Sequence, residues 1–223
     1  MSRASDPAPA QADAARRLSD PALHVHHAVL AAFTDAGRPP SAAELDVLAR
    51  RHGGDPDRVR EELAEADLLA FTGHGEIRAA YPFSPVPTAI QVSWDHQAPA
   101  YAMCAIDALG MSAMLGRPVT ITAAEPDTGK GITVAVDGDR ARWAPRSAIV
   151  FAGETAEAGC LAADRCCGYI NFFTRRRAAR AWARRHPSVS GTILRRDGAL
   201  RIGIDQFGTL LRLADGVASR DRG

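Results

Sequence analysis

Two residues at the start of an apolar segment are of the types that could do chemistry together. Cys104 and Asp107 stand three positions apart in a stretch, 101–115, that is predicted to be a helix closed by Gly116 and Pro118. On a helix this spacing places both side chains on one face. Soft metals bind the thiolate rather than the thiol, and a neighbouring carboxylate can accept the thiol proton. The same spacing also fits a cysteine that only packs in the core, beside an aspartate that is solvated. Free cysteines are more often packing residues of this kind than metal ligands.

The other three cysteines lie in one later segment. Cys166 and Cys167 are adjacent, and Cys160 lies upstream of them. Structural zinc sites space their ligand cysteines with two to four residues between them, and no pair here has that spacing. Thiolates suit thiophilic metals in general. Cysteines that merely pack in the core are the alternative interpretation of this segment too.

The elements that must position these residues begin with a helical module. Residues 1–20 are rich in Ala, Pro, Asp and Ser and are predicted to be a disordered arm. Three helices and a two-stranded wing are then predicted from apolar spacing and capping signals. The helices run through residues 23–31, from Ser41 with Glu44 completing a capping box, and from near Pro56; the strands are 68–71 and 77–81. Residues 21–82 are therefore predicted to be a winged-helix-like domain.

The second part of the chain, residues 83–223, mixes strand and helix patterns after a Pro-rich linker at Pro82, Pro85 and Pro87. Strands are expected at 119–122, 132–136 and 147–151, an apolar aromatic segment at 169–173, a basic helix at 175–186, and short terminal strands containing Ile193 and Ile202. The fold class is predicted to be α+β: the winged-helix-like three-helix module followed by a core of small, mostly antiparallel sheets flanked by helices.

The composition and charge of the chain disfavour nucleic-acid-binding, membrane and secreted proteins. The formal net charge is +1 and 46% of residues are hydrophobic, so bulk charge favours neither nucleic acid nor a membrane surface. No apolar run approaches the roughly 20 residues of a membrane helix, and the first 20 residues lack the apolar core of a signal peptide. We therefore expect a cytoplasmic location, no membrane partner and reduced cysteines.

Three other patterns are weighed and set aside. The predicted third helix, 55–67, carries six acidic residues against two arginines, which disfavours DNA binding and a regulator function. The arginines of 175–186 fit a solvated helix face, and binding of an anionic partner is the alternative interpretation. His24, His26 and His27 are read as polar surface rather than as a metal site.

Two longer segments resemble a known family. Tyr-Ala-Met-Cys-Ala-Ile-Asp at 101–107 resembles the Tyr-Ala-x-Cys-Ala-x-Asp segment of alkylmercury (organomercurial) lyases. Cys-Gly-Tyr-Ile-Asn-Phe-Phe at 167–173 is similar to their second segment, a cysteine five residues before a Phe-Phe pair. With Gly-Arg-Pro at 116–118, the Ala-Trp-Ala at 181–183 and the winged-helix-like start, the resemblance spans roughly 22–215. Two motifs in the right order are far more specific than either alone.

The resemblance implies a catalytic triad of Cys104, Asp107 and Cys167, which also hold the mercury. The Phe-Phe register selects Cys167; Cys166 falls where the family varies, Cys160 has no role in the pattern, and Met103 replaces the Trp beside the first cysteine in the best-known members. The implied activity is protonolysis of the Hg–C bond of R–Hg–thiol compounds to hydrocarbon and Hg(II), with mercury as substrate and no cofactor.

The implied partners are the organomercurial, cellular thiols and a mercuric reductase that takes Hg(II), with no nucleic acid. The alternative function is a non-catalytic thiophilic metal binder or metal-responsive regulator. Asp107 separates these two functions, because a binder needs the thiolates but no proton carrier.

Overall fold

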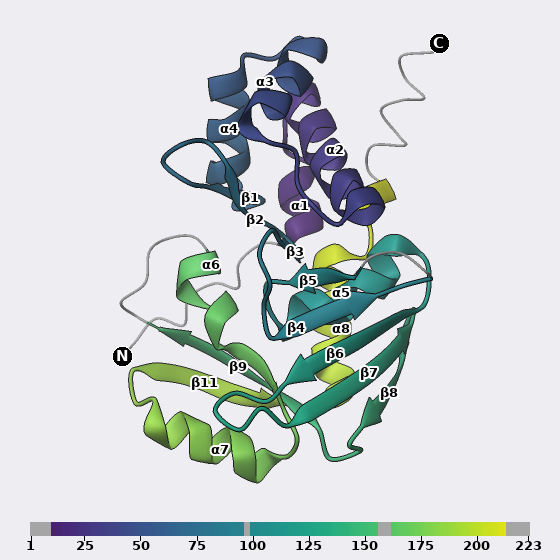
Figure 1. Ribbon diagram of the computed structural model, residues 1–223, viewed down its shortest axis with the longest axis vertical. Helices are drawn as coiled ribbons and strands as arrows, with labels where there is room; N and C mark the ends of the chain where they lie inside the picture. The colour runs from purple at the N-terminus through teal and green to yellow at the C-terminus, as the bar shows by residue number, and fades with distance from the viewer. Residues whose placement is uncertain (1–9, 96–98, 156–161, 213–223) are drawn as a thin grey trace.

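A computed structural model describes residues 10–95, 99–155 and 162–212 and shows an α+β fold (Figure 1). Every strand pairing in these residues is antiparallel. One sheet has eight strands in the order β1-β2-β3-β5-β4-β6-β7-β8, and a second has three in the order β10-β9-β11. The predicted fold class is therefore confirmed at the level of α+β with antiparallel sheets. None of the described helices is long and apolar enough to cross a membrane.

The three predicted N-terminal helices are present and lie together at one end of the molecule (Figure 1). They are α2 (Asp20–Ala36), α3 (Ala42–Arg51) and α4 (Pro56–Glu65). Each begins at a capping side chain: Ser19 accepts from the Ala22 amide, Ser41 and Glu44 form the capping box, and Asp55 accepts from the Arg58 amide. These acceptors satisfy amides that would otherwise lack partners at a helix start.

The expectation of a disordered arm over residues 1–20 is wrong for its second half. Residues 1–9 lie outside the described part of the chain, but Gln11–Ala15 form helix α1. Ala12, Ala14 and Ala15 are buried there, and Gln11 Nε2 donates to the Asp67 carbonyl at 3.1 Å. An alanine-rich segment resembles a disordered linker in composition, but its small side chains can also pack closely against a neighbouring helix, as they do here.

The wing is part of the large sheet, and the expected Pro-rich linker is wrong. Strands β1 (Leu69–Phe71) and β2 (Ile77–Ala80) form the predicted hairpin. Immediately afterwards β3 (Phe83–Ser84) pairs with β2 through Ala80 and Phe83. Proline at a strand end or edge costs no ladder hydrogen bond, so the prolines here mark the margins of a short strand. The helical module and the rest of the molecule thus share one sheet.

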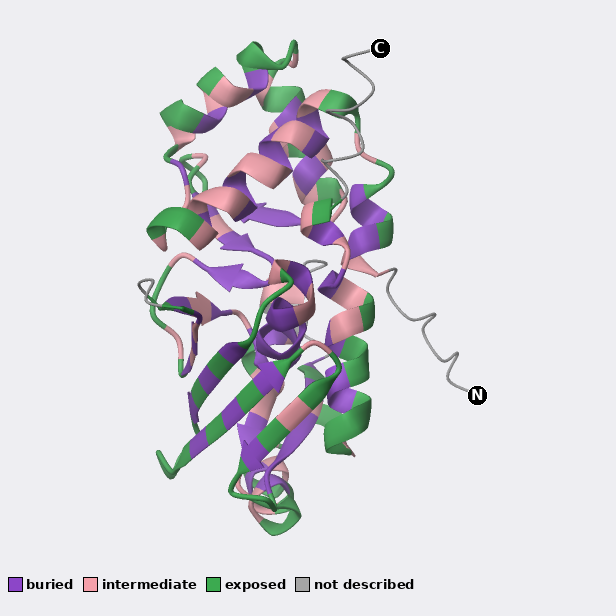
Figure 2. Ribbon diagram, turned by 90° about the vertical axis from the view of Figure 1, so that its right-hand side faces the viewer, coloured by how far each residue is buried: buried purple, intermediate pink, exposed green. Residues whose placement is uncertain are grey.

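The remaining strands of this sheet are β4 (Ile90–Ser93), β5 (Ala100–Ala102), β6 (Val119–Ala124), β7 (Gly131–Asp137) and β8 (Arg140–Ala144). Burial alternates residue by residue along β6 and β7, which Figure 2 shows as stripes. Alternation of this kind means that one face packs on the core and the other meets water. The buried face packs on helix α5 (Ala105–Leu115).

The small sheet consists of β9 (Ile149–Thr155), β10 (Ile170–Phe173) and β11 (Val189–Leu194). Helix α7 (Arg176–Arg185) covers it and buries Ala179 and Trp182 against Phe151 and Phe173 (Figure 1). The arginines of α7 lie on its outer side, so α7 is an amphipathic cover, as the sequence predicts. Two short segments, α6 (Ala162–Arg165) and the 3-10 helix η1 (Cys167–Tyr169), precede β10, and η2 (Leu210–Arg212) follows the last helix.

Two predictions for the second half are corrected. The terminal strand around Ile202 is instead helix α8 (Arg196–Phe207), and α5 begins at Ala105 rather than near 101 because residues 100–102 are strand β5. Strand β8 was not predicted. An isolated apolar residue such as Ile202 does not distinguish helix from strand, because the period of the pattern cannot be read from one position.

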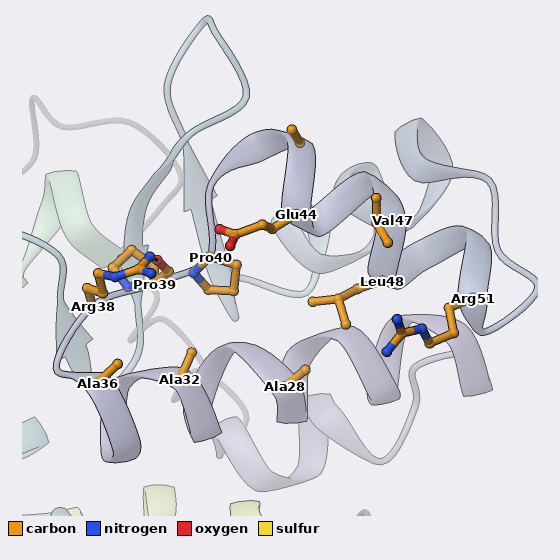
Figure 3. A pocket seen from close by; sticks show the side chains of 11 residues that line it. Ala28, Ala32, Ala36, Arg38, Pro39, Pro40, Glu44, Val47, Leu48 and Arg51 are labelled. Atoms are coloured by element: carbon orange, nitrogen blue, oxygen red, sulfur yellow. Dashed lines mark hydrogen bonds between the residues drawn. The ribbon is translucent and has the colours of Figure 1, made fainter.

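An apolar groove lies on the helical module between α2 and α3 (Figure 3). Its volume is about 520 Å³, and its walls are mainly the small or aliphatic side chains of Ala28, Ala32, Pro40, Val47 and Leu48. None of its lining residues carries a thiol or an imidazole. The groove therefore offers no thiol or imidazole for metal chemistry, and its charged lining residues are Arg38, Glu44 and Arg51.

Helices α5 and α8 touch backbone to backbone at Gly110 and Gly203. A Cβ added at Gly110 would lie 2.4 Å from the Gly203 carbonyl oxygen and 2.7 Å from Phe207 Cδ2. Only a residue without a side chain allows two helices to approach this closely. Because α5 carries Asp107 in its first turn, this contact also fixes the candidate site.

Gly110→Ala is expected to lower the free energy of unfolding by roughly 1–3 kcal/mol, because the added methyl forces apart two backbones. Gly198→Ala is the matched control: it lies on α8, is exposed, and has nothing within 4 Å of the added Cβ. This control should be neutral or slightly stabilising, since alanine is the better helix former. Denaturant unfolding of both variants measures the difference; equal stabilities would contradict the account of this contact.

Candidate active site

The structure brings Cys104, Asp107 and Cys167 together. Their sulfur and carboxylate ligand atoms all lie within 4.8 Å of one another. The three residues are 2%, 5% and 5% exposed, so the cluster is closed off from bulk water. In the part of the chain that the structure describes, they form the one group of three or more Cys, His, Asp or Glu side chains close enough to share a metal ion.

The sequence predicts Cys104 inside a helix, but in the structure the residue caps the start of one. It is the N-cap of α5, with extended backbone, and its Sγ accepts a hydrogen bond from the Asp107 amide at 3.5 Å. The three-residue spacing still brings the two side chains together, because the N-cap side chain faces the third residue of the helix, here Asp107 in the first turn. The partial positive charge of a helix N-terminus also favours negative charge on the sulfur.

Cys167 is held in place by the helical module. Cys167 follows α6, and the first two amides of α6 donate to side chains from the first half of the chain. The Ala162 N–H donates to the Asp67 carboxylate at 3.1 Å, and the Ala163 N–H donates to Tyr81 Oη at 2.6 Å. Both acceptors lie in or beside the β1–β2 hairpin. The second cysteine thus reaches the first because the wing strands fix the segment that precedes it.

Asp67 and Tyr81 were not singled out by the sequence. Asp67 is the last of a run of acidic residues on and after α4, and Tyr81 ends an apolar strand before a proline. Neither position carries a motif, and their partners are main-chain amides more than 80 residues away. No local pattern in the sequence could have shown that contact.

The histidines noted in the sequence do not join the cluster. The His24 ring stacks on His52 with centroids 4.4 Å apart, and its Nδ1 pairs with the Asp20 carbonyl. His26 is buried, and burial lowers its pKa to about 4, so it is neutral near pH 7. His27 Nε2 lies 3.2 Å from the Leu211 carbonyl. The prediction that these histidines form polar surface is therefore wrong for His26, which lies inside the protein.

Comparison with known proteins identifies a family for this arrangement. The family model described as MerB, alkylmercury lyase, matches residues 83–208, which is more than half of the chain. The chain belongs to the alkylmercury lyase family. Cys104, Asp107 and Cys167 all fall within the matched residues.

Relatives of this chain carry the same description. An alkylmercury lyase of Streptomyces lividans is 27% identical over 152 residues, 68% of each chain. One of Staphylococcus epidermidis is 27% identical over 146 residues, 66% of this chain and 67% of its own. The fold is similar to that of the mercury-bound form of MerB2, with a TM-score of 0.69 and 22% identity over 89% of this chain and 95% of the other.

Burial, hydrogen bonds or both raise the pKa of all three groups in this cluster. Burial raises the pKa of Cys104 to about 11, although a hydrogen bond with Cys167 opposes the shift. Burial also raises the pKa of Asp107 to about 8, against a hydrogen bond from the Cys104 thiol. Hydrogen bonds with Cys104 and Cys166, followed by burial, raise the pKa of Cys167. Near pH 7 the resting cluster is therefore predominantly neutral, with a proton on each of its three groups.

The aspartate has an unused hydrogen-bonding position. Asp107 Oδ2 is fully buried and has no hydrogen-bond partner in the structure. A buried polar atom without a partner is costly and uncommon outside functional sites. The oxygen lies in a cluster with two thiols, so it can take a proton from one group and give it to another without a change in the fold.

The effect of pH on stability tests the protonation of Asp107. The pKa of Asp107 is raised from 3.8 to about 8, so the folded protein keeps a proton that the unfolded chain loses above about pH 4. This contribution to stability is complete below about pH 4 and is lost as the pH rises to about 8, by roughly 1 kcal/mol per pH unit. Asp107→Asn does not ionise and should escape this loss.

The difference in the free energy of unfolding between Asp107→Asn and wild type should therefore shift in favour of the variant from about pH 4 to about pH 8. Denaturant unfolding across this range provides the measurement, and taking the difference removes the titration of groups common to both proteins. A difference that is constant, or that moves toward wild type as the pH rises, would mean that Asp107 is ionised in the folded protein.

Tyr81→Phe tests the anchoring of the second cysteine. Loss of the hydroxyl leaves the Ala163 amide without its acceptor, which should cost about 1–3 kcal/mol of stability. Hydrogen exchange at that amide should become faster than in wild type. Tyr101→Phe, at a half-buried tyrosine of β5, is the matched control and should leave this amide protected. Unchanged protection in Tyr81→Phe would show that α6 is held by other contacts.

Proposed function

We propose that this lyase cleaves the Hg–C bond of R–Hg–thiolate compounds by protonolysis, with Cys104 and Cys167 as mercury ligands and Asp107 as the proton carrier. The observation that carries this proposal is the buried cluster of two thiols and one carboxyl, whose ligand atoms lie within 4.8 Å of one another. Two thiolates at that separation can hold one thiophilic ion between them. The third group is at the distance needed to deliver a proton.

The neutral resting state provides both protons that the reaction needs. In the first step one cysteine thiol displaces the thiol ligand: its sulfur bonds to mercury, and its proton leaves on the departing R′SH. In the second step the other cysteine sulfur bonds to mercury, and its proton passes through Asp107 to the carbon. The overall reaction is R–Hg–SR′ + 2 Cys–SH → R–H + Hg(S-Cys)2 + R′SH. No electrons are gained or lost.

Asp107 suits the role of carrier because its pKa lies close to the working pH. A group with a pKa of about 8 can hold a proton at rest and release it to a stronger base in the transition state. The second thiolate donates electron density to mercury and weakens the bond to carbon, which makes that carbon the base. The burial that raises the pKa also keeps water from competing for the proton.

Thiols are the expected partners at both ends of the reaction. The substrate enters as a complex with a cellular thiol, and Hg(II) leaves by exchange with further thiols or with a mercuric reductase. The two cysteines must be reduced for this, so we place the enzyme in the cytoplasm. No resident cofactor enters the proposal, because mercury is the substrate and the protein supplies all the protons.

We propose that residues 21–82 form a winged-helix-like domain that supports the catalytic domain, residues 83–223, rather than reading DNA. The support comes from the bonds that Asp67 and Tyr81 make to α6. The charge on α4 also argues against DNA, since Arg60 is already paired with Asp46 and Asp57. A surface whose cations are neutralised by neighbouring carboxylates attracts phosphate weakly.

A non-catalytic thiophilic metal binder would use the same two cysteines. It would have no use for a buried, protonated carboxyl beside them, and burying a carboxyl oxygen without a hydrogen-bond partner costs stability. The position of Asp107 Oδ2, buried and without a partner, therefore favours the lyase over the binder.

Substitutions at the three positions separate chemistry from binding. Cys104→Ser and Cys167→Ser should each abolish hydrocarbon release from a phenylmercury–thiol complex, because one thiolate alone does not activate the Hg–C bond. Asp107→Asn should release hydrocarbon at least about two orders of magnitude more slowly, while Hg(II) binding survives because both thiols remain. Gas chromatography of the released benzene, with Hg(II) affinity measured in parallel, is the assay.

The matched control is Cys160→Ser, a cysteine outside the described residues, which should keep its activity. Wild-type turnover in Asp107→Asn would make the aspartate structural and would return the protein to the class of metal binders. Activity in Cys167→Ser together with its loss in Cys166→Ser would place the second ligand one residue earlier.

A further inference from the structure

The two proposed mercury ligands are difficult for a substrate to reach. Cys104 and Cys167 are almost completely buried, as is Asp107 between them. Ligand exchange on mercury requires the incoming sulfur to touch the metal while the leaving thiol is still attached to it. A complex of mercury with an organic group and a cellular thiol must therefore reach sulfurs on residues that are only 2% and 5% exposed. A more accessible sulfur next to the pair would remove this difficulty.

Cys166 has that position. It is the residue before Cys167, it is half-buried where its neighbour is buried, and it sits on the edge of the main hydrophobic core. Its Sγ lies 3.4 Å from the carbonyl oxygen of Ala162, to which the thiol donates, and it is hydrogen-bonded to the Cys167 side chain. The thiol therefore contacts Cys167, and the residue that carries it is more exposed than either member of the buried pair.

Cys166 is not a third ligand of the buried cluster. The group of mutually close ligand atoms comprises Cys104, Asp107 and Cys167, and Cys166 does not belong to it although the structure describes this residue. The geometry fits a thiol that holds mercury before the buried pair does, and not one that shares it with them.

We propose that Cys166 is an entry thiol that captures the organomercurial from its cellular thiol complex and passes it to Cys167. This inference rests on the proposed function and adds a binding step to it. In the capture step, R–Hg–SR′ + Cys166–SH → R–Hg–S-Cys166 + R′SH, an Hg–S bond forms, another breaks, and the thiol proton leaves on R′SH.

The transfer step is a second exchange of the same kind. Cys167 sulfur bonds to mercury as the bond to Cys166 breaks, and the proton of Cys167 returns to the Cys166 sulfur. Adjacent residues are held together by the backbone, so this exchange is intramolecular and does not depend on diffusion. Cys166 is thereby restored, and Cys104 then completes the reaction with the proton balance given above.

Steady-state kinetics with a phenylmercury–cysteine complex distinguish capture from chemistry. Cys166→Ser keeps a hydroxyl that can hydrogen-bond but cannot bind mercury, so kcat/KM should fall by about tenfold or more while kcat at saturating substrate falls much less. Cys160→Ser is the matched control and should leave both constants at wild-type values. An unchanged kcat/KM in Cys166→Ser, or an equal fall in kcat and kcat/KM, would overturn the entry role.

Direct capture can be measured without turnover. In a variant with Cys104→Ser, Cys160→Ser and Cys167→Ser, only Cys166 remains, and native mass spectrometry should show one phenylmercury adduct in the presence of a small excess of free cysteine. Adding Cys166→Ser should abolish the adduct. Absence of the adduct from the three-fold variant would refute capture at Cys166.

The two proposals fail in different ways. If wild-type protein takes up phenylmercury but releases no benzene, the proposed function fails; a missing adduct in the three-fold variant refutes the entry role whether or not benzene is released.

Discussion

Transfer of a thiolate or a carboxylate out of water is costly, and in this protein two thiols and one carboxyl lie together where little water reaches them. The fold meets this cost by keeping the groups protonated: burial raises the pKa of Cys104 to about 11 and that of Asp107 to about 8. The arrangement is stable while it is neutral. In the proposed mechanism, mercury takes the two sulfurs in exchange for their protons.

The two cysteines are held by different elements. Cys104 caps α5, Asp107 lies in its first turn, and α5 is fixed against α8 by the glycine contact. Cys167 depends on α6, which hydrogen bonds tie to Asp67 and Tyr81. The eight-stranded sheet connects these parts, because the wing strands continue into the strands that lead to Cys104. The helical module is therefore a structural part of the site, although it contributes none of its reacting groups.

The sequence predicted the local elements better than the contacts that join them. The capping box of Ser41 and Glu44, the helix start at Pro56 and the alternation along β6 and β7 are local signals, and the structure confirms those elements. The start of α5 was misplaced because an apolar run continues from strand β5 into the helix. The junction of the wing with the sheet and the anchoring of α6 depend on partners distant in sequence, so no pattern along the chain reveals them.

The net uptake of protons from solvent during a single turnover tests most directly the claim that the cluster rests neutral and supplies its own protons. Enzyme in excess over a phenylmercury–thiol complex, in weakly buffered solution near pH 7 with a pH indicator, should form benzene with no net uptake of protons. The two cysteine thiols supply one proton to the carbon and one to the departing thiol, whose own pKa lies above the working pH. Uptake of one or two protons for each benzene released would contradict the account, because it would show that the site rests in an ionised state and draws its protons from water.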